Sequence, residues 1–302
     1  MRHLLKLTDL SRDDFQRIIA RARVHTGDRT LAGEALVGKS IALLFQKHST
    51  RTRISATVAI TELGGNAVSL DQGALQIQRG ESLEDTAEVL ARYVNALIMR
   101  ATSHATLEAL ASVNAVPVIN GLTDRFHPCQ ALADYLTMEQ RGFVPGPDLA
   151  LTFIGEGNNV FNSLALGAMF NGTRVRIACP EGYEPDAELV RTVRDNGVEL
   201  EIFHDPFEAV RGAQVVYTDV WVSMGQEGEV DERQAKFAPY CISEDLLKEA
   251  ADDHIAMHCL PAHRGEEITD WVMNRFHEVI FQQAENRLHV QKAVLEWVFD
   301  VL

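Results

Sequence analysis

Short apolar runs alternate with segments of helical periodicity along nearly the whole chain, and this alternation restricts the fold more than any other feature. Such alternation is typical of parallel sheets whose strands are joined by crossover helices. The sequence therefore predicts an α/β protein. The strand-like runs lie at residues 41–45, 67–70, 96–100, 116–119, 149–154, 174–178, 215–218 and 255–258, and the helical segments at 12–23, 54–63, 83–93, 107–112, 129–140, 160–170, 186–196 and 286–299.

A stretch at residues 142–147 is the only Pro/Gly-rich segment in mid-chain. The 302 residues also exceed the usual size of a single hydrophobic core. We therefore expect two domains, residues 1–141 and residues 148–285, each a mostly parallel sheet flanked by helices, with an active-site cleft between them. The last helix, within residues 286–302, is expected to pack back on the first domain.

Charge and cysteine usage narrow the class of function. The chain has 28 basic and 43 acidic residues, a net charge of −15, which argues against a general nucleic-acid or acidic-membrane binder. An anionic ligand would have to be held by local positive groups. The four cysteines are scattered without a CxxC pair, as in reduced cytoplasmic proteins. No apolar run resembles a signal peptide or a membrane span.

The segment His48-Ser49-Thr50-Arg51-Thr52-Arg53 lies between a predicted strand and the predicted helix that follows it. The start of a helix has unpaired N–H groups and the positive end of the helix dipole, so it favours anions. Ser49, Thr50 and Thr52 add hydroxyl donors, and Arg51 adds a planar fork suited to phosphate. The alternative is an N-cap followed by a solvated turn with arginines in surface ion pairs. The alternation of arginine with threonine favours the anion site.

A second polar group, His127-Pro128-Cys129-Gln130, opens another predicted helix. His127 and Gln130 are three residues apart, so both can face one ligand. The alternative is a capping turn with a surface histidine. Arg100 ends a neighbouring strand, and this favours a ligand site, because ligands of such sheets bind beyond the carboxyl ends of the strands.

The loop Gly155-Glu156-Gly157-Asn158-Asn159-Val160 partly matches the dinucleotide pattern GxGxxG, with Glu181 in the ribose-binding place. The third glycine is replaced by Val160. The loop alone is equally compatible with an NAD(P)-dependent oxidoreductase, with asparagine side chains that bind a small ligand, and with a tight turn that binds nothing.

Two further groups follow predicted strands. Asp219 precedes a small loop, where a carboxylate would suit a substrate ammonium group; an N-cap and turn is the alternative. His258-Cys259 could indicate a metal site, but adjacent strand residues point to opposite faces, so we expect no zinc there. Cys259 could instead be partly thiolate near cations, or a buried structural cysteine.

Together these motifs resemble the aspartate/ornithine carbamoyltransferases, with the marks of the ornithine-specific branch. The resemblance extends from about Leu4 to Leu295 and implies transfer of a carbamoyl group from carbamoyl phosphate to the δ-amine of L-ornithine, giving L-citrulline and phosphate, without metal or cofactor. It also implies a cis Leu260–Pro261 bond. The motifs lie at residues 49–53, 127–130, 219–225, 258–261 and 283–287.

The resemblance also implies roles for individual residues. The carbamoyl phosphate contacts are Ser49, Thr50, Arg51, Thr52, Gln76, Arg100, His127, Gln130, Cys259, Leu260 and Arg287. The ornithine contacts are Asn159, Asp219, Ser223, Met224, Cys259 and Leu260. Arg51, Thr52, Arg100, His127, Cys259 and Arg287 are the expected catalytic residues.

The assembly expected from the resemblance is a homotrimer, or a multiple of trimers, in which Gln76 reaches the site of a neighbouring subunit. Two departures from the family pattern are Gln46, where many members have Glu, and Gln282, where many have Asp. The alternatives left open are a carbamoyltransferase for N-acetylornithine or putrescine, a non-catalytic homologue and, remotely, the NAD(P) oxidoreductase. Biosynthetic and catabolic direction are not distinguished.

Overall fold

The computed structural model describes residues 1–47, 49–71, 80–222 and 230–302. The chain forms two units, the first of Met1–Ala133 with Asn286–Leu302 and the second of Asp134–Glu285. Each unit contains one sheet in which all paired strands are parallel. The predicted α/β class with two parallel sheets is confirmed.

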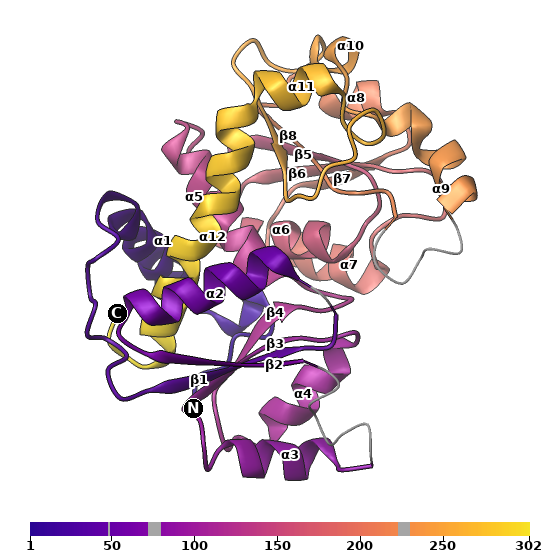
Figure 1. The fold of residues 1–302 in the computed structure, drawn as a ribbon. Coiled ribbons are helices and arrows are strands. Elements are labelled where there is room, and N and C mark those ends of the chain that lie inside the picture. Colours follow the sequence, from indigo (N-terminus) through magenta and orange to yellow (C-terminus); the bar gives the residue numbers. More distant parts are fainter. Residues whose placement is uncertain (48, 72–79, 223–229) are drawn as a thin grey trace. The chain divides into compact units, whose positions relative to one another are not determined.

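The sheet of the first unit has the strand order β2-β1-β3-β4 (Figure 1). One face of it packs on α3 and α4, where Leu44, Leu97 and Met99 meet Leu107. Figure 1 shows α2 on the other face. Strands covered on both faces read as continuous apolar runs, which is why they were visible in the sequence. The elements of this unit are η1 Leu7–Asp9, α1 Arg12–Gly27, β1 Ser40–Phe45, α2 Thr50–Glu62, β2 Asn66–Asp71, α3 Leu83–Leu90, β3 Ala96–Arg100, α4 His104–Ser112, β4 Val118–Leu122 and the start of α5 Pro128–Gln140.

The sheet of the second unit has the order β7-β6-β5-β8-β9. Figure 1 shows α6 and α7 on one face and α8 and α10 on the other. The central strand β5 is buried along its whole length. The elements are β5 Ala150–Ile154, α6 Asn159–Ala168, β6 Arg174–Ala178, α7 Ala187–Asp195, β7 Leu200–Phe203, α8 Pro206–Val210, β8 Val215–Thr218, α9 Val230–Phe237, η5 Ala238–Tyr240, α10 Glu244–Leu247, β9 Ile255–His258, α11 Asp270–Arg275 and α12 His277–Val298.

The structure differs from the sequence-based expectation at several boundaries. Helix α12 begins at His277 and not at residue 286, and α5 and α12 both have residues in each unit. The second unit begins within α5, whereas the division was expected at residues 142–147. Strand β7 and helices α8 to α11 were not predicted. No helix in the described part of the chain combines the length and the apolar character needed to span a bilayer.

Buried charges hold the end of α12 in the first unit. The Lys292 ammonium is fully buried and lies 3.3 Å from a Glu62 carboxylate oxygen, and it also donates to the Arg29 carbonyl. The buried Glu296 carboxylate accepts from the Arg21 guanidinium at 2.6 Å and bonds to a nitrogen of the His25 ring at 2.7 Å. A buried charge without such partners would cost several kcal/mol, about 3–5 when one partner is removed. These contacts fix the part of α12 that carries Arg287.

Candidate active site

The first turn of α2 follows β1 directly. Ser49 is the N-cap of this helix, and its hydroxyl accepts from the Thr52 N–H at 3.3 Å. Arg51 is exposed on this turn. The Arg53 guanidinium instead lies 4.3 Å from the centroid of the Phe45 ring and donates to the Ser69 hydroxyl at 2.6 Å. The two arginines of the motif therefore have different surroundings. The helix was expected from Ile54, with the polar motif just before it, but the motif forms the cap and first turn.

Arg100 reaches this turn from the next strand. It is the last residue of β3 and pairs with Phe45 at the end of β1, so the parallel register places it beside the start of α2. Its guanidinium donates to the Ser49 hydroxyl at 3.3 Å. The carboxyl ends of two neighbouring strands thus bring a cation to a helix N-terminus, which is an arrangement that binds anions.

Arg287 gathers three of the predicted residues from α12. One of its terminal nitrogens donates to the Thr52 hydroxyl at 2.7 Å. The other lies 3.0 Å from the Gln130 amide oxygen and 3.1 Å from Nε2 of His127. Because a guanidinium only donates, Nε2 accepts, and the ring proton of a neutral His127 is on Nδ1.

His127 is held as a neutral ring. Burial lowers the pKa of its imidazole well below the usual range, and the positive charges of Arg287 and Arg100 lower it further. The loop before it is fixed by the Thr123 N–H, which donates to the Phe126 carbonyl at 2.9 Å. Pro128 then starts α5. The ring is therefore a neutral group among cations, suited to hydrogen bonding and not to carrying charge.

Asp219 is the centre of the second group of predicted residues, at the end of β8. One of its carboxylate oxygens accepts from the Asn158 amide at 3.0 Å, and the other accepts from the Cys259 thiol at 2.9 Å. The side-chain oxygen of Asn158 also caps α6, where Asn159 is the first residue. Three strand ends of the second sheet, β5, β8 and β9, thus place their polar residues together.

Cys259 is buried, in agreement with one of its two expected states, and its thiol donates to the Asp219 carboxylate. The argument that His258 and Cys259 point apart is wrong, since ligand atoms of Asp219, His258 and Cys259 all lie within 4.8 Å of one another. Strand β9 ends at His258, so the alternation of a strand does not extend to Cys259.

The turn after Cys259 has special geometry. The Leu260–Pro261 peptide is cis, as predicted, and Leu260 has a φ of +58°. The Leu260 N–H donates to Nδ1 of His258 at 2.9 Å, and Nε2 of His258 lies 3.0 Å from a Glu267 oxygen. Gln283 of α12 accepts from the His258 N–H at 3.0 Å. This turn is therefore tied to buried polar groups on two sides.

Comparisons with known proteins agree across the chain. Residues 2–140 match the aspartate/ornithine carbamoyltransferase carbamoyl-P binding domain, and residues 147–298 match the Asp/Orn binding domain of the same family. The chain belongs to the aspartate/ornithine carbamoyltransferase family.

Individual relatives of this carbamoyltransferase family are similar over nearly their full length. An ornithine carbamoyltransferase of Archaeoglobus fulgidus is 49% identical over 98% of this chain and 96% of the relative. An anabolic ornithine carbamoyltransferase of Pyrococcus furiosus is 47% identical over 98% of this chain and 96% of its own. A solved structure of the P. furiosus enzyme superposes with a TM-score of 0.93 at 46% identity, covering 100% of this chain and 98% of that one.

The glycine loop has a structural reason within this carbamoyltransferase fold. A Cβ on Gly157 would lie 2.3 Å from the Pro185 backbone nitrogen, so the close approach of two chain segments requires glycine there. The Gly157 N–H donates to the Tyr183 carbonyl at 2.9 Å. Gly157 is thus explained without a dinucleotide, and Gly155 has a φ of +142°, which side chains other than glycine rarely adopt, so the oxidoreductase alternative is not favoured.

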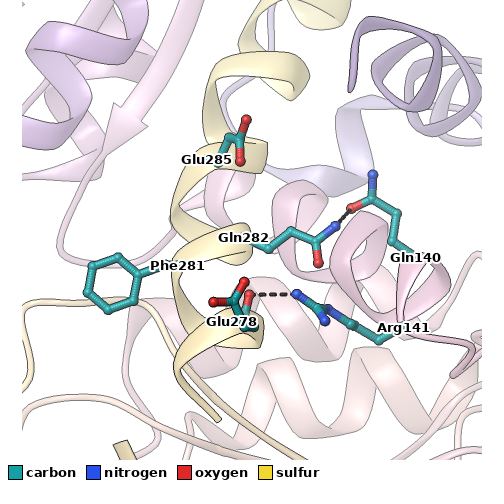
Figure 2. A pocket seen from close by; sticks show the side chains of 6 residues that line it. All are labelled: Gln140, Arg141, Glu278, Phe281, Gln282 and Glu285. Carbon is teal, nitrogen blue, oxygen red and sulfur yellow. Dashed lines mark hydrogen bonds between the residues drawn. The ribbon is translucent and has the colours of Figure 1, made fainter. Parts of the chain in front are cut away.

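The two departures from the carbamoyltransferase pattern have local partners. The Gln46 amide oxygen accepts from the Thr102 N–H at 2.9 Å, just beyond Arg100. The Gln282 amide donates to the Gln140 amide oxygen at 2.8 Å (Figure 2). Both glutamine side chains thus hold loops or helices, and the Gln46 N–H also donates to the carbonyl of the predicted site residue Arg100 at 2.9 Å.

A pocket of about 450 Å³ lies beside Gln282, between the end of α5 and α12 (Figure 2). None of the predicted carbamoyltransferase site residues lines it. Arg141 crosses it and donates to the Glu278 carbonyl at 2.6 Å. It is therefore separate from the candidate site. The lining residues are Gln140, Arg141, Glu278, Phe281, Gln282 and Glu285.

Sequence reasoning missed some residues and named others that the structure does not describe. Asn158, which holds Asp219, was read as a ligand-binding amide or a turn residue; its place just before a helix was the signal for a cap. Gln76, Ser223 and Met224 lie outside the described residues. The remaining predicted residues form two groups, one in each unit.

The depressed pKa of His127 predicts a pH dependence of stability. Between the lowered pKa of the folded state and about 6.5 in the unfolded chain, only the unfolded state binds this proton. The free energy of unfolding should therefore increase with pH in this window, by up to about 1.4 kcal/mol per pH unit. As the pH falls below about 6.5, the free energy of unfolding should decrease by the same amount per unit. Urea unfolding at several pH values should show a shallower dependence for His127→Gln. Parallel curves for the two proteins would contradict the assignment.

Proposed function

We propose that the protein is an ornithine carbamoyltransferase, which transfers the carbamoyl group of carbamoyl phosphate to the δ-amine of L-ornithine and releases L-citrulline and phosphate. The observation that carries the proposal is the cluster of Arg51, Arg100 and Arg287 around the N-terminal turn of α2 and the neutral His127. Relatives that are 46–50% identical have this activity in their names, which supports the same conclusion.

The phosphate of carbamoyl phosphate would bind at the first turn of α2. Ser49, Thr50 and Thr52 supply hydroxyl groups there, and the Arg51 guanidinium supplies charge. As the bond between the carbamoyl carbon and the phosphate oxygen breaks, negative charge grows on the phosphate. Groups that are already in place stabilise this charge without reorganisation. The residues would therefore act mainly on the transition state.

The carbamoyl group would lie toward Arg100, His127 and Gln130. Attack on the carbamoyl carbon places negative charge on the carbamoyl oxygen. The Arg100 guanidinium and the protonated nitrogen of His127 are donors suited to this oxygen. Arg287 fixes His127 and Gln130 in place through its two bonds to them. We propose that neutral His127 has this role, because an imidazole N–H can donate a hydrogen bond to the carbamoyl oxygen without carrying a net charge.

Ornithine would bind in the second unit. We propose that Asp219 accepts from its α-ammonium group and that Asn159, with Ser223 and Met224, completes the contacts to the amino-acid end. The δ-amine, as the free base, would lie near Cys259 and the Leu260 carbonyl. It attacks the carbamoyl carbon, phosphate leaves, and the amine gives up a proton. Both substrates must be bound together, which provides the advantage of proximity.

A direct assay tests the proposal. Purified protein with carbamoyl phosphate should form citrulline and phosphate with L-ornithine. It should form far less carbamoylated product with N-acetylornithine, putrescine or aspartate, because each lacks the α-ammonium group, the carboxylate or the δ-amine that the site recognises. A higher kcat/KM for any of these three would overturn the choice of substrate. Release of no phosphate with any amine would indicate a non-catalytic homologue.

We further propose a cytoplasmic homotrimer, or a multiple of trimers, that acts in arginine biosynthesis. The biosynthetic direction is supported by relatives from P. furiosus and Campylobacter jejuni whose names include the word anabolic. The biosynthetic direction would be tested by whether a strain that lacks the gene still grows without added arginine. The trimer rests on the family resemblance of the loop that contains Gln76, which lies outside the described residues.

Mixing two inactive variants tests shared sites. We expect Gln76→Ala with Arg79→Ala, and separately Arg51→Ala, to be inactive alone. After subunit exchange, a mixed trimer would contain sites in which a native loop meets a native Arg51, so activity should return. Exchange is verified by mass measurement of differently tagged subunits. A mixture that remains inactive after such exchange would place the loop in the site of its own subunit.

A further inference from the structure

A second cluster of ligating side chains lies just beyond the Leu260–Pro261 turn. His263, Glu266 and Glu267 bring a ring nitrogen and two carboxylate oxygens within 4.8 Å of one another. Nδ1 of His263 is 3.9 Å from Oε2 of Glu266 and 3.8 Å from Oε2 of Glu267. A tight turn, in which the Glu266 N–H donates to the His263 carbonyl at 2.9 Å, holds the three residues together.

Glu267 distinguishes this cluster from a group of surface side chains, because Glu267 is fully buried. Its Oε1 accepts from the His263 N–H at 2.6 Å and bonds to Nε2 of His258 at 3.0 Å. Its Oε2 is also buried but has no hydrogen-bond partner within the described residues. A buried carboxylate oxygen without a partner costs free energy, because it has lost its hydrogen bonds to water. This oxygen is directed toward the His263 ring.

We propose that His263, Glu266 and Glu267 form a binding site for a divalent transition-metal ion such as Zn²⁺. An imidazole nitrogen with carboxylate oxygens is a suitable donor set for such an ion. Ligands of one tetrahedral ion lie about 3.3 Å apart, so the two distances from Nδ1 of His263 need to shorten by only about half an ångström, and the three ligand atoms already lie within 4.8 Å of one another. The side chains of His263 and Glu266 are 50% and 36% exposed, so they can move and the ion can enter from solvent.

The other candidate group, Asp219 with His258 and Cys259, is less suited to an ion. Nδ1 of His258 accepts from the Leu260 N–H, and Nε2 bonds to Glu267. The Cys259 thiol donates to Asp219. An ion there would have to displace these bonds. At the proposed site, by contrast, the ion would satisfy the buried oxygen of Glu267 without breaking the bonds of its partner oxygen.

Metal binding would also reinforce the turn. Glu267 joins the proposed ion to His258, and His258 accepts from the Leu260 N–H. Carboxylates that bridge a metal and a histidine fix the orientation of both. The ion should therefore stabilise the second unit by mass action, with a thermal midpoint that rises with the concentration of free Zn²⁺.

Metal titration of the full chain tests the proposal. We would use metal-free protein without an affinity tag and with Cys259→Ser, so that no thiolate from that position can bind. Calorimetry with Zn²⁺ should show one equivalent bound, and Co²⁺ should give absorption bands of a site with nitrogen and oxygen ligands. Loss of a residue that only supports a metal ligand usually weakens metal binding roughly 10–100-fold. Loss of a ligand itself should cost at least as much, so we expect His263→Ala, added to this protein, to weaken Zn²⁺ binding by at least this factor, and Glu266→Gln to weaken it similarly.

A matched control is His277→Ala. His277 is another half-exposed histidine beside a glutamate, with Nδ1 3.6 Å from Glu278, but among the described residues it belongs to no group of three possible ligands. It should leave the Zn²⁺ affinity and the rise in thermal midpoint unchanged. His263→Ala keeps the backbone donor to Glu267, and circular dichroism would verify its fold. Equal Zn²⁺ affinity in the Cys259→Ser protein with and without His263→Ala would overturn the proposal, as would the absence of any Zn²⁺ binding.

Discussion

Arg51→Ala is expected to lower kcat for citrulline formation by on the order of 10²–10³ at saturating carbamoyl phosphate, the usual cost of losing a positioned donor to a transition-state charge. Arg51 is exposed on the first turn of α2, where the helix dipole already favours an anion. Its guanidinium would meet the phosphate as the leaving group gains charge. An exposed side chain contributes little to folding, so the thermal midpoint should change little.

Arg53→Ala is the matched control for this experiment. It removes the same charge two residues away, but the Arg53 guanidinium is directed to the Ser69 hydroxyl and the Phe45 ring. We therefore expect a much smaller loss of kcat, with the main effect on stability. Steady-state rates and thermal unfolding of both variants separate the two roles. Equal losses of kcat, or an unaltered kcat in Arg51→Ala, would remove Arg51 from the site.

Much of the first unit could be predicted from the sequence because its signals are local. Strands covered on both faces read as apolar runs, and the Ser-Thr-Arg-Thr-Arg motif follows one of them directly. The carboxyl ends of parallel strands meet at one edge, so Arg100 could be placed at the same edge as Ser49, whereas the pairing of β3 with β1, which brings the two residues into contact, is given by the structure. The start of α2 was placed too late because its first turn consists of polar residues that carry no hydrophobic periodicity.

Other features depend on contacts that no local pattern reveals. Arg287 reaches Thr52 across 235 residues, and only the family resemblance indicated its role. Helices α8, α10 and α11 have only four to six residues, too few for a periodic pattern. The alternation rule failed at Cys259 because the strand ends one residue earlier. The buried Lys292, by its residue type, would have been expected on the surface.

Asp219→Asn is expected to raise the KM for ornithine strongly and to leave the KM for carbamoyl phosphate nearly unchanged. Removing one partner of a buried charge pair costs about 2–5 kcal/mol, which corresponds to a factor of ~30 or more. The carboxylate is 9% exposed, and the Asn158 amide and the Cys259 thiol hold it in place. Asparagine has the same shape but lacks the charge that would pair with the α-ammonium group.

A substrate without that group makes the test specific. 5-Aminopentanoate has the carboxylate and the δ-amine of ornithine but no α-ammonium, so the wild-type protein should use it poorly. If Asp219 binds the ammonium, Asp219→Asn should cost much less in kcat/KM with this substrate than with ornithine. Asp186→Asn, which removes a carboxylate from the N-cap of α7 in the same unit, is the control and should affect neither substrate. Equal losses with both substrates would instead make Asp219 a positioning residue, acting through Asn158 and Cys259, because its effect would then not depend on the group it was proposed to bind.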